Sequence, residues 1–426
     1  MKYYFASLIL VIMSLLPFPA NAELLPGYEN SFPQKITKTV NGVSFDSDYD
    51  NGSLLNVEPD GSNTFQCELY TEDGEIGPRK YWFRFRMYGT AGRKITLMLD
   101  HHLNPRPVVK LGTQPWRRLT TEEAPDRDRI ILTFGDENFA ELAFFFPSGY
   151  SETFQKVGNL VRRCDEATSK VIGQSFMGRD IWMVEVTDRS VPNYGKHRVW
   201  IHSRIHAGEV TSTLTMLGML QLVTEDTPLG RYLRRHIIFN IVPLVNVDGV
   251  WLGHTRWDSQ GIDPERQWAN PDRIPETAHL YENVNRFMAG GNPIEISLNL
   301  HSTIGTYTDT FFFKHVQPSV TEEFENIQQR YIDAFSRTTP LFDHLAKITS
   351  QLHESRYIES YYWNNWGESV MAMTHEGHFY RRTTDQEWIT DEDYYDIGRA
   401  MIAAMIEYFN LPPAEEVPRK NIWIHY

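Results

Sequence analysis

The first third of the chain alternates apolar and polar residues with the two-residue period of β-strands. In residues 81–88, one face of the expected strand carries no charge and consists of Tyr81, Phe83, Phe85 and Met87. Four more short segments rich in β-branched or aromatic residues are expected to be strands: 64–70, 94–99, 129–134 and 140–146. Clusters of Gly, Asp and Pro separate several of them, as expected for turns. This pattern predicts an antiparallel β-sandwich domain over residues 23–150.

From about residue 151, apolar runs of strand length alternate with helical patterns. The expected strands are residues 197–205, 237–245, 294–300 and 369–374. The expected helices are residues 209–223, 277–288, 321–335 and 391–408. Buried strands joined by helices predict an α/β domain over residues 151–412, built on a mixed, mostly parallel central sheet. Residues 413–426 are expected to form a C-terminal tail.

Residues 1–22 have the pattern of an export signal. Lys2 is followed by the apolar run LILVIMSLL at residues 8–16, and Ala20-Asn21-Ala22 fits a cleavage site. The apolar run is shorter than the ~20 residues that cross a bilayer, although an N-terminal anchor remains the alternative. We therefore expect an exported protein, periplasmic or secreted, with no stable membrane insertion once the signal is removed.

Composition narrows the classes of protein and of metal site. With 41% hydrophobic and 23% charged residues, the chain is ordinary globular material. A net charge of -14 argues against a general nucleic-acid binder. The two cysteines, Cys67 and Cys164, are too few for a four-cysteine zinc site, so a metal would need histidine and carboxylate ligands. They could form a disulfide in an oxidising compartment or remain two isolated buried thiols.

Three residues at strand ends have the chemistry of a zinc site. His206 and Glu209, in the sequence HAGE, lie where an expected strand gives way to a helix, and an imidazole and a carboxylate at this spacing can converge on one cation. Catalytic zinc takes three protein ligands, and His301 follows another expected strand at the same sheet edge. Glu209 could instead serve only to stabilise the helix N-terminus. That alternative explains neither histidine.

Two arginines and a further glutamate follow the candidate metal ligands. Arg256 and Arg266 lie beyond the turn that begins at Asn246. A guanidinium group suits carboxylate capture and oxyanion stabilisation, although loop arginines are commonly solvated or salt-bridged. Glu376 ends an expected strand at the same sheet edge, where it could act as a general base.

In this order, the motifs resemble those of the zinc metallocarboxypeptidase family, namely H-x-x-E, N-P-D-G, an arginine, N-R, a strand-terminal His and T-x-E. The greatest similarity is to the cytosolic-carboxypeptidase-like branch, whose R-V-H-P-G-E and N-R-Q-W motifs are similar to RIHAGE at residues 204–209 and RQW at residues 266–268. The segment YWFRFRMYG at residues 81–89 resembles the aromatic signature of the β-sandwich that precedes the catalytic domain in that branch. The resemblance covers nearly the whole chain after the export signal.

The resemblance implies a role for each residue of the motifs. His206, Glu209 and His301 would bind one Zn²⁺ ion. Glu376 would take a proton from the zinc-bound water and deliver it to the leaving amine. Arg256 would hold the oxyanion, and Arg266 would bind the C-terminal carboxylate of a peptide. The implied activity is that of a carboxypeptidase, which the expected export signal would make an exported one.

Departures from the family pattern leave the substrate open. Glu265 replaces the family's Asn beside Arg266, and a carboxylate pointing into the site would repel a terminal carboxylate and favour an amine. A zinc amidase or deacylase is therefore one alternative, and an inactive peptide-binding module is another.

Asn246 and Tyr361 complete the expected substrate contacts. Tyr357 and Tyr362 are further candidates for the tyrosine that caps the bound end of the substrate, and each of the three tyrosines could equally be loop packing. Arg356 is a candidate selector of glutamate side chains.

Overall fold

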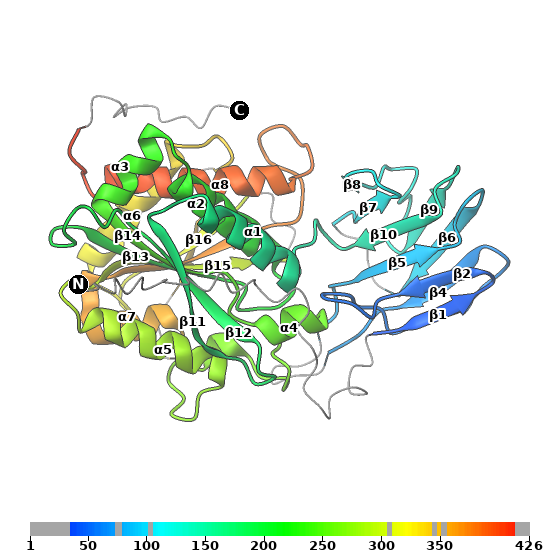
Figure 1. Ribbon diagram of the computed structural model, residues 1–426, viewed down its shortest axis with the longest axis horizontal. Coiled ribbons are helices and arrows are strands. Elements are labelled where there is room, and N and C mark those ends of the chain that lie inside the picture. The colour runs from blue at the N-terminus through cyan, green and yellow to red at the C-terminus, as the bar shows by residue number, and fades with distance from the viewer. Residues whose placement is uncertain are drawn as a thin grey trace, which may run out of the picture.

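A computed structural model describes residues 35–413 apart from 73–78, 101–104, 305–308, 343–346 and 351–355. The expected export signal and nearly all of the expected tail lie outside the described residues. Two small sheets lie on one side of the molecule, and a larger sheet with helices on both faces lies on the other (Figure 1).

Two sheets pack face to face in the first part of the chain. One sheet is antiparallel and has the order β1 (Thr37–Val40), β2 (Val43–Asp46), β5 (Arg84–Tyr88), β10 (Phe139–Ala143), β7 (Val108–Leu111) and β8 (Arg117–Arg118). The other has the order β3 (Asn56–Pro59), β4 (Thr64–Glu68), β6 (Lys94–Leu99) and β9 (Arg129–Thr133), with β4 and β6 parallel. Apolar side chains from both sheets form the core between them, where the rings of Phe45 and Phe65 meet edge to face at 5.0 Å. The predicted antiparallel sandwich is confirmed apart from the parallel pair.

The alternation in β5 predicts that its polar face is exposed, but Arg84 on this face is buried. Arg84 is only 3% exposed, and its Nε donates to Glu141 Oε1 of β10 at 2.8 Å. Its Nη2 donates to Glu152 Oε1 at 2.7 Å. Because Glu152 belongs to α1 (Tyr150–Arg162), this ion-pair network joins the sandwich to the first helix of the α/β part.

We expect Arg84→Leu to lower the free energy of unfolding by about 3–5 kcal/mol, because the buried Glu141 carboxylate would lose the nearer of its two counterions and keep only Arg86 at 3.7 Å. Urea unfolding measures this loss. Arg117→Leu is the control, since it removes an exposed pair with Glu123 that contributes at most about 1 kcal/mol. Equal losses in the two variants would contradict the assigned role of Arg84.

The larger sheet confirms the predicted mixed α/β architecture. Its strand order is β11 (Ala167–Gln174), β12 (Asp180–Val186), β14 (Ile237–Val242), β13 (His197–Ser203), β15 (Ile294–Ser302), β18 (Met371–Gly377), β16 (Phe311–His315) and β17 (Lys347–Ser350). The four central strands are β14, β13, β15 and β18, and they are mutually parallel. Strands β12 and β16 flank them in antiparallel orientation. The carboxyl ends of β13, β15 and β18 therefore meet at one edge of the sheet.

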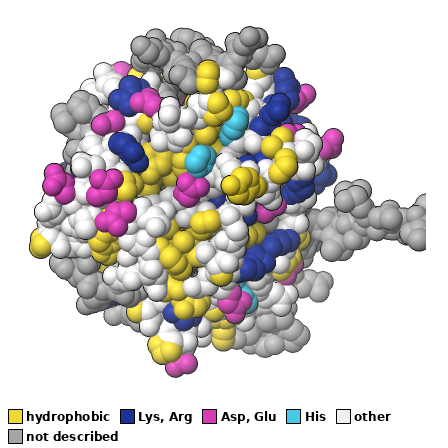
Figure 2. All heavy atoms as spheres, turned by 90° about the vertical axis from the view of Figure 1, so that its left-hand side faces the viewer, with side chains coloured by type: hydrophobic (Ala, Val, Ile, Leu, Met, Phe, Trp, Pro, Cys, Tyr) yellow, Lys and Arg dark blue, Asp and Glu magenta, His cyan; other side chains and the backbone are white. Residues whose placement is uncertain are grey.

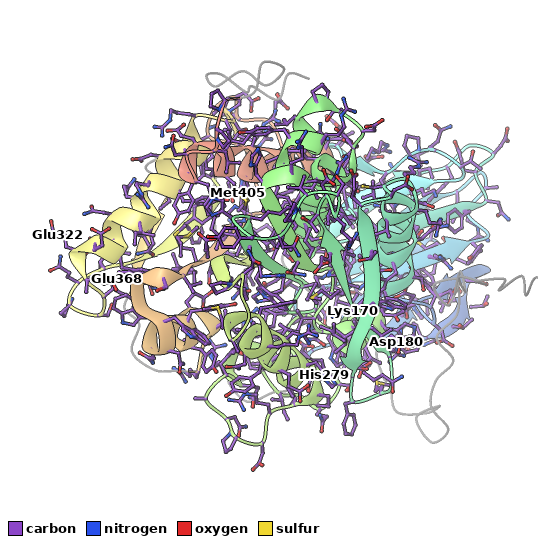
Figure 3. The ribbon with its side chains drawn as sticks, turned by 60° about the vertical axis from the view of Figure 1, so that its left-hand side comes forward. Lys170, Asp180, His279, Glu322, Glu368 and Met405 are labelled. Carbon is purple, nitrogen blue, oxygen red and sulfur yellow. The ribbon has the colours of Figure 1, made fainter. Side chains whose placement is uncertain are left out.

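Helices cover both faces of this sheet (Figure 1). One face carries α1, α2 (Val210–Thr224), α3 (Pro228–His236), α6 (Glu322–Ser336) and α8 (Asp391–Tyr408). The other carries α4 (Val247–Leu252), α5 (Pro275–Met288) and α7 (Ile358–Trp366). Helices α2 and α8 approach closely at two glycines, since a Cβ atom at Gly218 or Gly398 would lie within 2.0 Å of a backbone oxygen of the other helix. Figure 3 shows His279 on α5 beside the β11–β12 hairpin, which carries Lys170 and Asp180.

Two further expectations concern the cysteines and the membrane. Cys67 and Cys164 are both free and buried, so the isolated-thiol alternative is confirmed and the disulfide alternative is wrong. Within the described ranges, no helix has the length and apolar character needed to cross a membrane.

Candidate active site

Tertiary structure brings the predicted metal-binding residues to one sheet edge. The chain leaves β13 through Arg204, whose backbone has a left-handed φ of 58°. The buried Arg204 side chain holds the following turn, with Nε donating to Ala207 O at 2.6 Å. This turn presents His206 and then Glu209, which immediately precedes α2. His301 lies in β15 directly beside Glu376 of β18.

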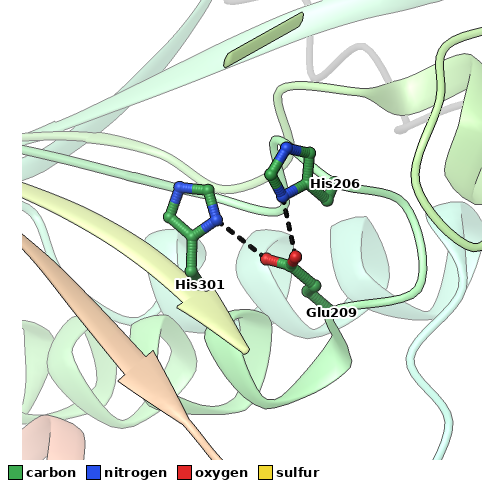
Figure 4. Close-up of side chains that lie close together, drawn as sticks. All are labelled: His206, Glu209 and His301. Atoms are coloured by element: carbon green, nitrogen blue, oxygen red, sulfur yellow. Dashed lines mark hydrogen bonds and ion pairs between the residues drawn. The ribbon is translucent and has the colours of Figure 1, made fainter. Parts of the chain in front are cut away.

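His206, Glu209 and His301 form a buried group able to hold a metal ion (Figure 4). Nδ1 of His206 lies 2.7 Å from Glu209 Oε1, and Nδ1 of His301 lies 2.9 Å from Glu209 Oε2. Burial by itself would raise the pKa of Glu209, but the two imidazoles hold it well below its usual range. Two imidazole nitrogens and one carboxylate within 4.8 Å of one another match the donor set of a catalytic zinc site.

The second ring nitrogen of each histidine faces a carboxylate. Nε2 of His206 lies 3.2 Å from Asp263 Oδ1, and Nε2 of His301 lies 3.4 Å from Glu265 Oε2. Carboxylates in this position fix the tautomer and orientation of ligating imidazoles and raise their basicity. Both candidate ligands are therefore oriented through their outer nitrogens.

The direction of Glu265 decides how it affects Arg266. The Glu265 carboxylate accepts from Asn299 Nδ2 at 3.1 and 3.2 Å in addition to facing His301. The Arg266 guanidinium instead forms an ion pair with Asp263. Glu265 thus lines the cavity, but its carboxylate points toward Asn299 and His301 of β15 and not toward the Arg266 guanidinium.

Asp263 organises both arginines and was not singled out by the sequence reasoning. Its fully buried carboxylate accepts from Arg256 Nη2 at 2.8 Å and from Arg266 Nη1. Burial by itself would raise the pKa of Asp263, but His206 and the two arginines hold it far below its usual range. The sequence feature that could have pointed to Asp263 is its position three residues before Arg266. One carboxylate therefore positions both candidate arginines and a candidate ligand.

The sandwich domain supports the loop that carries Arg256. Glu72 accepts from the backbone N–H groups of Arg256 and Trp257, and burial raises the pKa of Glu72 to about 8. Tyr81 OH donates to Thr255 O at 3.2 Å. The first domain is thus in direct contact with a candidate catalytic loop.

These residues surround one cavity of about 820 Å³. Seven of the predicted site residues line it: His206, Glu209, Arg256, Glu265, Arg266, His301 and Glu376. Residues that sequence reasoning did not assign also line it: Phe313, His315, Thr349, Ser350, Glu359 and Thr374. Figure 2 shows one face of the molecule, on which histidine, acidic, basic and hydrophobic side chains are interspersed.

Two of the predicted substrate contacts lie elsewhere. Asn246 is buried and caps α4, while its Nδ2 donates to Trp257 O at 2.9 Å, so it shapes the arginine loop. Tyr361 packs against Trp268 and donates to Asn285 Oδ1 at 2.8 Å. Neither residue lines the cavity, where Tyr357 and Arg356 are found instead. Direct substrate contact by Asn246 and Tyr361 therefore stays a prediction.

Glu376 faces the metal group from the neighbouring strand. Its Oε2 is buried and has no hydrogen-bond partner among the described residues. Burial raises the pKa of Glu376 to about 8, opposed by the charges of His301 and Arg256. An unpartnered carboxylate oxygen beside the candidate ligands is placed to exchange a proton with a reacting group.

Known proteins share both the sequence pattern and the fold. Residues 155–392 match the model of the zinc carboxypeptidase family. Cytosolic carboxypeptidase 6 of Mus musculus is 25% identical over 414 residues, covering 87% of this chain and 74% of that protein. The Homo sapiens protein of the same name is 22% identical over 409 residues, covering 87% of this chain and 80% of that protein.

Solved structures agree with this assignment. A metallocarboxypeptidase from Burkholderia cenocepacia has a TM-score of 0.74 at 20% identity, covering 86% of this chain and 99% of that chain. A metallocarboxypeptidase from Pseudomonas aeruginosa has a TM-score of 0.72 at 17% identity, covering 85% of this chain and 99% of that chain. At this level of identity, the likeness establishes the fold. Together with the family match, it shows that this chain belongs to the zinc carboxypeptidase family of hydrolases.

Proposed function

We propose that the protein removes C-terminal residues from peptides, with one Zn²⁺ ion held by His206, Glu209 and His301. The observation that carries this proposal is the convergence, around one cavity, of the candidate metal group, Glu376 and two arginines anchored on Asp263. When bound, zinc supplies a Lewis acid that polarises a carbonyl and acidifies a water molecule.

The side chains divide the remaining work. Glu376 accepts a proton from the attacking water and returns it to the leaving amine. Arg256 stabilises negative charge that develops on the carbonyl oxygen, since Asp263 holds its guanidinium beside His206. Arg266 pairs with the terminal carboxylate of the substrate, which restricts cleavage to the last residue.

The orientation of Glu265 favours a carboxypeptidase over an amidase. Its charge is engaged by Asn299 and His301, which lie on β15. Arg266 also lines the cavity, and its charge can attract a substrate carboxylate there. Export is proposed from residues 1–22 alone, whose apolar run and small-residue cleavage site are typical of a signal peptide.

The proposal is tested with matched peptides that have free or amidated C-termini. We expect the zinc-loaded protein to cleave the free peptide at least about 100-fold faster, because each hydrogen bond from Arg266 to a charged carboxylate contributes about 1.5–3 kcal/mol. Chelation should abolish this activity and added zinc should restore it. Hydrolysis that resists chelators, or equal cleavage of amidated peptides, would overturn the proposal.

We expect His301→Ala to reduce bound zinc from one ion per chain to a small fraction, because one of three protein ligands is lost. Metal analysis after dialysis measures the stoichiometry. His279→Ala is the control, because this histidine lies on α5 at the β11–β12 hairpin, away from the cavity lining. Unchanged zinc content in His301→Ala would exclude the assigned ligand set.

A further inference from the structure

Two buried carboxylates lie side by side in the wall of the substrate cavity. Glu265 and Glu359 are 5% and 4% exposed, and both line the cavity. Asn299 Nδ2 bridges them, donating to Glu265 Oε1 at 3.1 Å and to Glu359 Oε1 at 3.2 Å. Thr374 Oγ1 donates to the same Glu359 oxygen at 2.7 Å.

Strand register places Glu359, one of the two carboxylates in this acidic pair, one step deeper than the metal group. Asn299 pairs with Thr374 across β15 and β18, just as His301 pairs with Glu376 two residues further on. Side chains two residues apart point to the same face of a sheet. At about 3.3 Å per residue, Glu359 therefore belongs to a layer roughly 7 Å further from the strand ends.

The acidic pair lacks a strong cation of its own. No Lys or Arg side chain in the described part of the chain forms an ion pair with Glu359, and the basic group that faces Glu265 is His301. Burial, followed by the charge of Glu265, raises the pKa of Glu359 to about 7. A cation entering the cavity would relieve this cost, because an opposite charge nearby favours the ionised carboxylate.

His315 provides a second, independent sign of a ligand in the same cavity. It is 4% exposed, lines the cavity from β16, and neither of its ring nitrogens has a hydrogen-bond partner among the described residues. Burial lowers the pKa of His315 to about 4, so its imidazole is neutral and can accept a hydrogen bond. Phe313, two residues earlier on this strand, adds an apolar surface to the lining.

We infer that the cavity selects peptides whose C-terminal residue has a cationic side chain, such as lysine or arginine, and that Glu359 is the residue that binds the cation. This inference rests on the proposed carboxypeptidase function. Arg266 takes the terminal carboxylate, the side-chain stem passes Phe313, and the charged end reaches Glu359, which lies beside Glu265. The exposed Arg356 also lines the cavity. If Arg356 bound the substrate side chain, the enzyme would have the opposite preference, for an acidic C-terminal residue.

The test compares kcat/KM for peptides that differ only in their last residue: lysine, arginine, norleucine or glutamate. We expect lysine and arginine to exceed norleucine by ~10- to ~100-fold, the range for a hydrogen-bonded charge. Glu359→Gln should bring the lysine-to-norleucine ratio close to one, because the amide keeps the side-chain shape but loses the charge. Glu368→Gln, an exposed glutamate that accepts from Thr321, should keep the wild-type ratio.

A measurement on the wild-type protein makes the test independent of how well the variants fold. Free lysine should inhibit ~10-fold more tightly than norleucine, which has the same stem without the ammonium group. Equal inhibition by the two amino acids would overturn the inference. A preference for glutamate that disappears in Arg356→Gln would also overturn it, while leaving the carboxypeptidase function standing. Failure to cleave any peptide of the series would instead overturn the proposed function on which it rests.

Discussion

Glu376→Gln is expected to lower kcat by about 10²–10⁴-fold, the usual contribution of a general base, while zinc binding is retained. The amide occupies nearly the same volume as the carboxylate but cannot accept the proton. Glu376 is not one of the three candidate ligands and lies beside His301 on the neighbouring strand, so the metal group should keep its geometry. Steady-state kinetics on a free-C-terminal peptide, together with metal analysis, gives both readouts.

Glu323→Gln serves as the matched control, because this glutamate is exposed in the first turn of α6 and does not line the cavity. It should retain wild-type turnover. The same pair of variants separates an enzyme from an inactive peptide-binding module. If the wild-type protein binds peptides without hydrolysis and Glu376→Gln binds them equally well, the binding module is the correct reading.

Asp263→Asn is expected to lower kcat/KM by about 10²–10⁴-fold, because two guanidinium groups would lose charged hydrogen bonds that contribute about 1.5–3 kcal/mol each. Zinc affinity should also fall by about 10- to 100-fold, the typical cost of losing the outer partner of a ligating histidine. Titration of the metal-free protein with zinc, followed by kinetics at saturating metal, separates the two effects. The kinetic loss should persist when the site is fully loaded.

Asp272→Asn is the control for this experiment, since Asp272 is exposed and lies nine residues further along the same connecting segment. Its kinetics and zinc affinity should match those of the wild-type protein. Full recovery of Asp263→Asn at saturating zinc would show that Asp263 acts through His206 alone. The assigned anchoring of Arg256 and Arg266 would then be wrong.

Local periodicity predicted the long, regular elements of the fold. Residues 209–223 and 391–408 were expected to be helices and correspond closely to α2 and α8. Shorter elements such as β1 and β7 span four residues each and were missed, because so few residues hold little periodic signal. The burial of Arg84 was also missed, because its partners Glu141 and Glu152 lie 57 and 68 residues away in the sequence.

The sequence likewise predicted some features of the candidate site and missed others. The spacing of His206 and Glu209 and the strand-terminal position of His301 sufficed to predict the metal group that the structure brings together. The kind of site could be predicted because few residue types bind zinc and because the carboxyl ends of parallel strands meet at one edge of the sheet. Asn246 and Tyr361 were predicted to contact substrate but do not line the cavity, since chain position does not show which way a side chain points.

The sequence by itself determined the classes of domain, the chemistry of the ligands and the family. Only the tertiary structure decided that Asp263 joins the two arginines to His206, and that Glu265 faces His301. It also brought Glu359 beside Glu265, although the two lie far apart in the sequence, through the shared amide of Asn299. The physical reason is that residue type and periodicity are properties of short segments. The direction and partners of a buried charge depend instead on how distant segments pack.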